Sequence, residues 1–185
     1  MKRTAGEAFV VVGPPAVGKS TTARLLASTA ATGVHVPVDA LRDFVVSGLV
    51  LPGADYSEAL DEQVRAARQV ALAALTTYTE LGFTVVLDDF LDPTGLLEYH
   101  EVVRSRRATG VVLRPDREVA IARARQREAT PEGAAYICMG IEVVFSCLDE
   151  VLPRLTGLGW QVLDNTNLDP SETVAAILDL GRGRD

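Results

Sequence analysis

The sequence predicts an α/β fold in which a five-stranded parallel sheet carries helices on both faces. Short, continuous apolar runs alternate with longer segments of helical periodicity along the whole chain. Strands that are apolar on both sides are typical of a parallel sheet buried between two helical layers. The length of 185 residues is that of one domain, and we expect a single domain over residues 1–185.

Five apolar runs are expected to form the strands. They cover residues 8–12, 34–38, 83–87, 110–113 and 160–163. Pro37 cannot donate a hydrogen bond to a neighbouring strand, which places the second strand at an edge of the sheet. Ligands of such folds bind at the carboxyl ends of the strands. Charged residues stand at or just beyond most of those ends in this chain, which locates the functional edge.

The connecting segments are predicted to be helical. They cover about residues 20–31, 40–50, 57–81, 93–107, 115–128, 134–155 and a last stretch that begins at Pro170. Gly33 is the expected end of the first of them. Thr130 to Gly133 read as a turn. The arginine-rich segment over about 115–133 is expected to act as a lid.

Residues 13–20 carry the most specific motif of the chain. They read Gly-Pro-Pro-Ala-Val-Gly-Lys-Ser, a complete G-x-x-x-x-G-K-S phosphate-binding loop between a strand and a helix. Backbone N–H groups of such a loop face the phosphates at the positive end of the helix. The motif therefore predicts binding of ATP with Mg²⁺. The expected nucleotide-binding residues are Gly13, Pro14, Pro15, Ala16, Val17, Gly18, Lys19, Ser20 and Thr21.

Lys19 and Ser20 have distinct expected roles in this loop. Lys19 reaches the β- and γ-phosphates, and the Ser20 hydroxyl holds Mg²⁺. The chain has only one other lysine, Lys2. A lysine thus stands where a compact ammonium on a flexible stem is needed.

The third apolar run ends in two adjacent carboxylates, Asp88 and Asp89. A carboxylate at this point orients Mg²⁺ in P-loop enzymes. Side chains alternate along a strand, so one of the two must face away from the metal. We assign Asp88 to magnesium. Asp89 either contacts the acceptor or serves as a helix cap or surface acid.

Asp39 ends the second apolar run, and Arg42 follows three residues later. A carboxylate there faces the γ-phosphate across the cleft and can accept the proton of an acceptor hydroxyl. Arg42 is then placed to clamp a polar or anionic acceptor group. The alternative is an N-cap aspartate beside a surface arginine.

Arginines are concentrated in the predicted lid. Arg123 and Arg127 are four residues apart and share a helix face, whereas Arg125 points elsewhere. Such guanidinium groups can close over the triphosphate; the alternative is a solvated helix face. After the fifth strand, Asn165 and Thr166 offer donors and acceptors to the adenine edge, or form an ordinary polar turn.

Composition restricts the partners. The net charge of −7 argues against an extended nucleic-acid track without excluding nucleic acid. Cys138, Cys147 and two histidines are too few for a zinc cage, and the cysteines read as buried thiols of a reducing cytoplasm. No run reaches transmembrane length and no signal-peptide core follows Met1. We expect a cytoplasmic protein without a membrane partner; the oligomeric state is not determined by the sequence.

Together these residues resemble the small-molecule and nucleotide kinases of the P-loop NTPase superfamily. In particular, the chain resembles chloramphenicol phosphotransferase: Gly-Lys-Ser in the loop, Val38-Asp39, the Asp-Asp-Phe-Leu run from Asp88, then a Val-x-Leu-Arg strand and an arginine-rich lid. The resemblance implies that Asp39 is the base for the acceptor hydroxyl. The Asp39-x-x-Arg42 spacing also resembles 5′-hydroxyl polynucleotide kinases, and zeta-toxin-like kinases share the plan. Residues 43–60, expected to bind the acceptor, match none of them in detail.

Three functions follow in order of preference. The first is an ATP-dependent kinase that phosphorylates a hydroxyl of a small-molecule acceptor, such as an antibiotic or a metabolite. The second is a kinase for a nucleotide or a nucleic-acid 5′ end, and the third a P-loop ATPase or GTPase that is not a kinase. The run from Asp164 to Asn167 is not the guanine-reading Asn-Lys-x-Asp, which argues against a GTPase.

Overall fold

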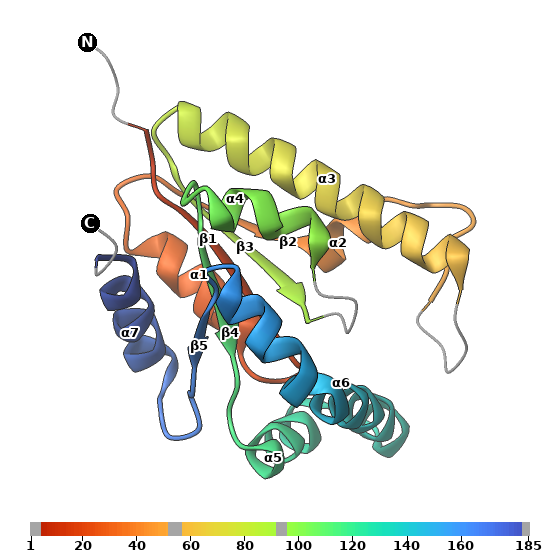
Figure 1. Ribbon diagram of the computed structural model, residues 1–185. Coiled ribbons are helices and arrows are strands. Elements are labelled where there is room, and N and C mark those ends of the chain that lie inside the picture. Colours follow the sequence, from red (N-terminus) through yellow and green to blue (C-terminus); the bar gives the residue numbers. More distant parts are fainter. Residues whose placement is uncertain (1–4, 52–56, 92–95, 183–185) are drawn as a thin grey trace.

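The computed structural model describes residues 5–51, 57–91 and 96–182. Within these ranges, five parallel strands form a sheet in the order β2-β3-β1-β4-β5 (Figure 1). The strands are β1 (Ala8–Gly13), β2 (Gly33–Pro37), β3 (Thr84–Phe90), β4 (Thr109–Leu113) and β5 (Gln161–Leu163). β1 lies at the centre between β3 and β4. β2 lies at an edge, as Pro37 predicts.

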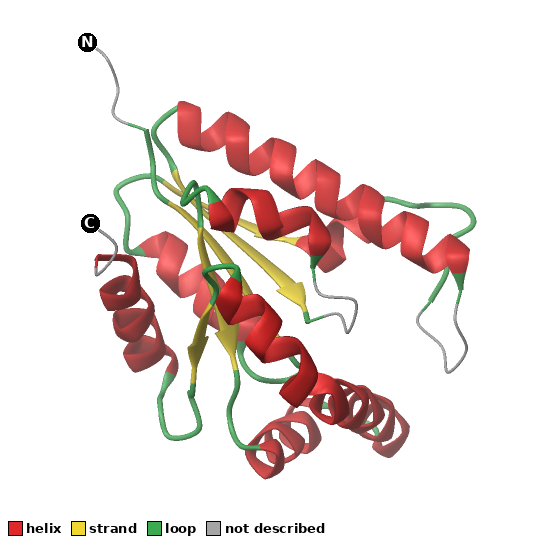
Figure 2. Ribbon diagram, viewed as in Figure 1, coloured by secondary structure: helices red, strands yellow, loops and turns green. Residues whose placement is uncertain are grey.

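Helices cover both faces of this sheet (Figure 2). They are α1 (Lys19–Ser28), α2 (Val38–Arg42), α3 (Glu58–Glu80), α4 (His100–Arg104), α5 (Arg117–Arg127), α6 (Pro131–Gly157) and α7 (Pro170–Arg182), with the 3₁₀-helix η1 (Leu97–Tyr99) before α4. α3 and α4 lie on one side of the sheet, and α1 and α7 lie on the other (Figure 1). The predicted α/β fold class is confirmed.

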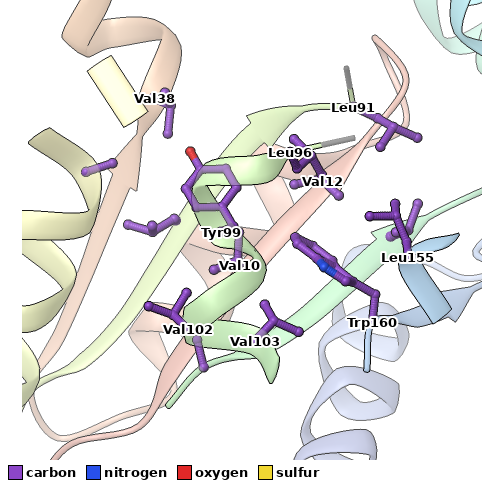
Figure 3. Close-up of a cluster of buried hydrophobic side chains, with 14 of the residues drawn as sticks. Val10, Val12, Val38, Leu91, Leu96, Tyr99, Val102, Val103, Leu155 and Trp160 are labelled. Carbon is purple, nitrogen blue, oxygen red and sulfur yellow. The ribbon is translucent and has the colours of Figure 1, made fainter. Parts of the chain in front are cut away.

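The central strand separates two hydrophobic cores. Val10 and Val12 pack on the side of α3 and α4, together with Tyr99 and Trp160 (Figure 3). Phe9 and Val11 face the other core, which contains residues of α1, α5 and α7. Every residue of β1 is buried. Burial on both faces explains why the strand reads as an unbroken apolar run rather than an alternating one.

The same alternation divides the two carboxylates at the end of β3. Asp88 lies opposite Val11 of β1 and Asp89 lies opposite Val12. Asp88 therefore points to the face of α1, and Asp89 points to the face of α3 and α4. The strand register alone sends these neighbouring acids into different surroundings.

The helix predicted over residues 40–50 is wrong in extent, because α2 ends at Arg42. Gly48 has a φ of 77°, in the left-handed region that a helix cannot use. The loop backbone is satisfied by a side chain of α3 instead. Val50 N donates to Oε1 of Gln63 at 3.0 Å, and Nε2 of Gln63 donates to the Gly48 carbonyl at 2.8 Å.

The turn predicted from Thr130 to Gly133 is also wrong, since α6 begins at Pro131. The Thr130 hydroxyl caps the helix by accepting from Gly133 N at 3.1 Å. Proline fits the first helical position, where its missing N–H costs nothing. Only residues 128–130 remain to join α5 to α6.

Two further helix boundaries differ from the predictions. α1 ends at Ser28 rather than near residue 31, and the Thr29 hydroxyl donates to the Leu26 carbonyl at 2.7 Å. The helix predicted over about 93–107 starts partly outside the described residues, which omit 92–95. Its remainder forms η1 and α4, and the chain leaves the helix at Arg106, whose φ is 59°.

Candidate active site

The phosphate-binding loop joins β1 to α1 in a conformation that requires glycine. Gly13 has a φ of 155°, and a Cβ there would lie 2.5 Å from the Leu113 carbonyl oxygen. Gly18 has a φ of 97° directly before α1. Left-handed residues within such a loop form a concave nest of N–H groups that binds anions. The loop geometry is therefore that of a phosphate site at a helix N-terminus.

Lys19 lies at the centre of the charged groups of this site. Its Nζ donates to the Pro14 carbonyl at 2.8 Å, so the side chain folds back along the loop. Burial lowers the pKa of Lys19, while Asp88 and Asp39 raise it. Both carboxylates are thus close enough to act on the ammonium that is expected to meet the β- and γ-phosphates.

Ser20 and Asp88 meet across 68 residues of sequence. Ser20 Oγ donates to Oδ1 of Asp88 at 2.9 Å. A hydroxyl and a carboxylate are hard oxygen donors, which Mg²⁺ prefers. Among the described residues no group of three or more His, Cys, Asp or Glu side chains could hold a metal. The donor set fits a Mg²⁺ ion that takes its other ligands from nucleotide phosphates and water.

His35 is a neighbour of Asp88 that sequence reasoning missed. It lies on β2, and its Nε2 contacts Oδ2 of Asp88. The two residues are 53 apart in sequence. The sequence offered one signal, the alternation of side chains along each strand. It predicts this contact only when β2 and β3 are known to be neighbours and their register is known.

Asp89 lies on the opposite face of the sheet, in a buried polar network. Its Oδ2 accepts hydrogen bonds from Arg68 Nε at 2.7 Å and from the Tyr99 hydroxyl at 2.9 Å. Arg68 also donates to Glu98 at 3.2 Å. Burial raises the pKa of Asp89, and Arg68 opposes that shift. Arg68, on α3, is another residue that sequence reasoning missed.

Asp39 is exposed in the first turn of α2. The N-cap of this helix is Pro37, so Asp39 does not occupy the cap position that was its alternative reading. Arg42 occupies the last turn, and its guanidinium donates to the Val50 carbonyl at 2.8 Å. Arg42 therefore contacts the loop after α2 in this structure, and its role at the acceptor stays a prediction.

The arginines of α5 differ in what they reach. Arg123 donates to the Asn165 carbonyl at 3.1 Å and to the Val17 carbonyl at 3.5 Å, which bridges the P-loop and the loop after β5. Arg127 lies close enough to lower the pKa of Lys19, and it pairs with Glu128 at 2.8 Å. Arg125 and Arg127 are both exposed. The structure thus brings Arg123 into contact with the P-loop, and the role of Arg127 at the phosphates stays a prediction.

The loop after β5 is tied to the P-loop by a buried amide. Asn165 is 3% exposed, and its Nδ2 donates to the Val17 carbonyl at 3.0 Å. Thr166 accepts from Asp116 N at 2.7 Å and bonds Asp164 through its hydroxyl. Thr166 is engaged through its hydroxyl and Asn165 through Nδ2, whereas Oδ1 of Asn165 is buried without a hydrogen-bond partner among the described residues. The contact of these two residues with the adenine edge stays a prediction.

The sequence matches one known family over most of its length. The model of the family described as AAA domain matches residues 10–137, from within β1 to the first turns of α6. No curated protein matches the chain significantly. Among the residues that the structure describes, no helix is long and apolar enough to cross a membrane.

Several solved kinases share the fold. Shikimate kinase from Acinetobacter baumannii in complex with shikimate aligns with a TM-score of 0.67 at 16% identity, over 98% of this chain and 96% of that one. A gluconokinase from Sinorhizobium meliloti 1021 aligns with a TM-score of 0.61 at 16% identity, over 98% of this chain and 94% of that one. Thymidylate kinase from Candida albicans aligns with a TM-score of 0.62 at 11% identity, over 97% of this chain and 92% of that one.

At these identities the likeness shows the fold alone, which is that of P-loop kinases. None of these three structures is a chloramphenicol phosphotransferase. The narrower resemblance to that enzyme therefore stays a prediction.

Proposed function

We propose, from the premise that the chain belongs to the AAA domain family, that it is an ATP-dependent kinase that transfers the γ-phosphate to a hydroxyl of a small molecule. One observation supports this most directly. Lys19, Asp39 and Asp88 stand at or shortly after the carboxyl ends of β1, β2 and β3, which are neighbours in one parallel sheet. A base, a phosphate-binding cation and a metal-site carboxylate are thus grouped at one end of the sheet.

Asp39 is the proposed general base. Its carboxylate takes the proton of the acceptor hydroxyl while the hydroxyl oxygen bonds to the γ-phosphorus. The bond between that phosphorus and the β–γ bridging oxygen breaks, and ADP leaves with the electron pair. Asp39 is exposed, so an acceptor can reach it without displacing other side chains.

Cationic groups compensate the charge that develops on the phosphates. In the proposed mechanism, Lys19 binds the β- and γ-phosphates, and Arg127, which pairs with Glu128 in this structure, turns to the γ-phosphate. Arg123 keeps the P-loop and the loop after β5 together. Ser20 and Asp88 would hold Mg²⁺, which supplies charge neutralisation at the phosphate oxygens.

The surface that follows Asp39 favours an acceptor of low negative charge. Exposed acids are frequent there, at Asp43, Glu58, Asp61 and Glu62. The nearby Arg42 is already bound to the Val50 carbonyl. Exposed apolar side chains also stand in this segment, namely Phe44, Val46 and Leu51. A polynucleotide needs basic stripes and stacking platforms, so a small acceptor with an apolar part fits better.

The decisive experiment compares Asp39→Asn with Asp149→Asn, a control that changes an exposed aspartate on α6. The proteins are incubated with ATP, Mg²⁺ and a panel of hydroxyl compounds, nucleosides and 5′-hydroxyl oligonucleotides, and acceptor-dependent ADP release is measured. We expect Asp39→Asn to lower kcat about 100-fold or more, with the KM for ATP retained. The control should match the wild type.

Two outcomes would contradict the proposal. A loss of ATP affinity without a fall in kcat would make Asp39 part of the nucleotide site. Turnover with oligonucleotides in preference to every small molecule would replace the small acceptor by a nucleic-acid end.

A further inference from the structure

His35 stands on the strand that neighbours the metal-site carboxylate. In the β2–β3 ladder, His35 lies opposite Val86, and Pro37 lies opposite Asp88. Side chains two residues apart on a strand point to the same face, so His35 and Asp88 share the face of α1. The His35 side chain is 13% exposed and the Asp88 side chain 6%. The imidazole thus lies beside a nearly buried carboxylate instead of in solvent.

The two oxygens of Asp88 have different partners. Oδ1 accepts the hydrogen bond of the Ser20 hydroxyl at 2.9 Å, and Oδ2 contacts Nε2 of His35. An ionised carboxylate only accepts hydrogen bonds, so Nε2 carries the proton in this contact. The carboxyl group is therefore fixed at both ends, by a side chain of α1 and by a side chain of β2.

We infer that His35 is a positioning residue, which orients Asp88 for the Mg²⁺ that accompanies ATP. This inference rests on the proposed function, because it needs a metal–nucleotide complex at the P-loop. His35 itself touches neither metal nor phosphate in this arrangement. It acts through Asp88 by preventing rotation of the carboxylate away from Ser20. Hydrogen-bond partners of metal-site ligands typically change metal affinity 10–100-fold when they are removed.

A purely structural role for His35 makes a different prediction. If the imidazole only filled space at the edge of the sheet, an apolar side chain of similar size would replace it without effect on the metal. If it instead blocked Oδ2 from the metal, its removal would tighten metal binding. The sign and the size of the change in metal affinity therefore separate the three cases.

The test measures metal binding directly. Each protein is saturated with a non-hydrolysable ATP analogue, and Mg²⁺ affinity is measured by calorimetry, with Mn²⁺ binding followed by electron paramagnetic resonance. We expect His35→Ala and His35→Leu to weaken metal binding about 10–100-fold. His35→Gln retains an N–H donor at similar reach and should keep most of the affinity. His100→Ala, which changes the chain's other histidine, should bind metal like the wild type.

Folding does not obscure this comparison. Should His35→Ala fail to fold, the contrast between the leucine and glutamine variants still decides. Equal metal affinity in those two variants, wild-type affinity in a folded His35→Ala protein, or tighter binding without the imidazole would each overturn the assignment.

No acceptor is present in these measurements, so they are independent of phosphoryl transfer. A failure of the His35 assignment leaves the kinase proposal intact. A wild-type protein that binds no metal–nucleotide complex would remove both.

Discussion

Loss of the Asp89 carboxylate should destabilise the fold strongly. Its Oδ2 accepts a hydrogen bond from Arg68 Nε at 2.7 Å. The Arg68 side chain is 2% exposed and the Asp89 side chain 0%. Substitution by alanine leaves the guanidinium buried without its nearest carboxylate, although Glu98 remains at 3.2 Å. Removing one partner of a buried ion pair lowers the free energy of unfolding by about 3–5 kcal/mol. For a chain of this length such a loss lowers Tm by about 6–20 °C.

The assay is urea and thermal unfolding of Asp89→Ala followed by circular dichroism. Glu98→Gln is the matched control, because it removes the more exposed and more distant partner of Arg68; we expect a loss of about 1 kcal/mol. Replacing both Arg68 and Asp89 by leucine should recover much of the stability, since apolar replacement of a whole buried pair is often neutral. An Asp89→Ala loss no larger than that of Glu98→Gln would refute the reasoning.

Three other predictions concern the nucleotide site. Burial lowers the pKa of Lys19 below its usual 10.5. At a pH between the folded and the unfolded pKa the unfolded chain binds more protons, so Lys19 makes the unfolding free energy of the nucleotide-free protein rise with pH. Lys19→Met should remove that rise when Tm is compared from neutral to alkaline pH. Arg127→Ala should lower kcat with ATP far more than Arg125→Ala, and a larger defect at Arg125 would reverse the facing of α5. Hydrogen exchange should slow at the backbone amides of 164–168 and 13–21 when ATP binds, whereas an unchanged 164–168 would remove this loop from the site.

The parts predicted from sequence are those that depend on local pattern. The apolar runs around Val10 and Val86 predicted strands because each is buried on both faces. The P-loop was found because its glycines and Lys19 lie within one short segment, residues 13–20. That Asp88 and Asp89 face opposite sides of the sheet followed from strand alternation, although alternation did not say which of them faces α1.

The parts that sequence did not predict depend on contacts between distant segments. His35 meets Asp88 only because β2 lies next to β3, and Arg68 is buried only because Asp89 faces α3. The hydrogen bond of Arg42 to a loop carbonyl eight residues later was not predicted either. The partner of a side chain depends on which segments pack together in the fold. The periodicity of one segment does not predict which other segment packs against it.

The short connection between α5 and α6 has a consequence for the entropy of nucleotide binding. Arg123 and Arg127 lie on α5, which forms a helical hairpin with α6. Residues 128–130 connect the two helices, and the Arg117–Glu142 ion pair also joins them. Ordering a chain segment costs about 1–2 kcal/mol per residue, so a long lid that folds only over its ligand weakens binding. Here the arginines are already on formed helices, and little conformational freedom is left for ATP to remove. If Arg127 binds the phosphates as proposed, closure involves movement of formed helices and side chains rather than the folding of a flap.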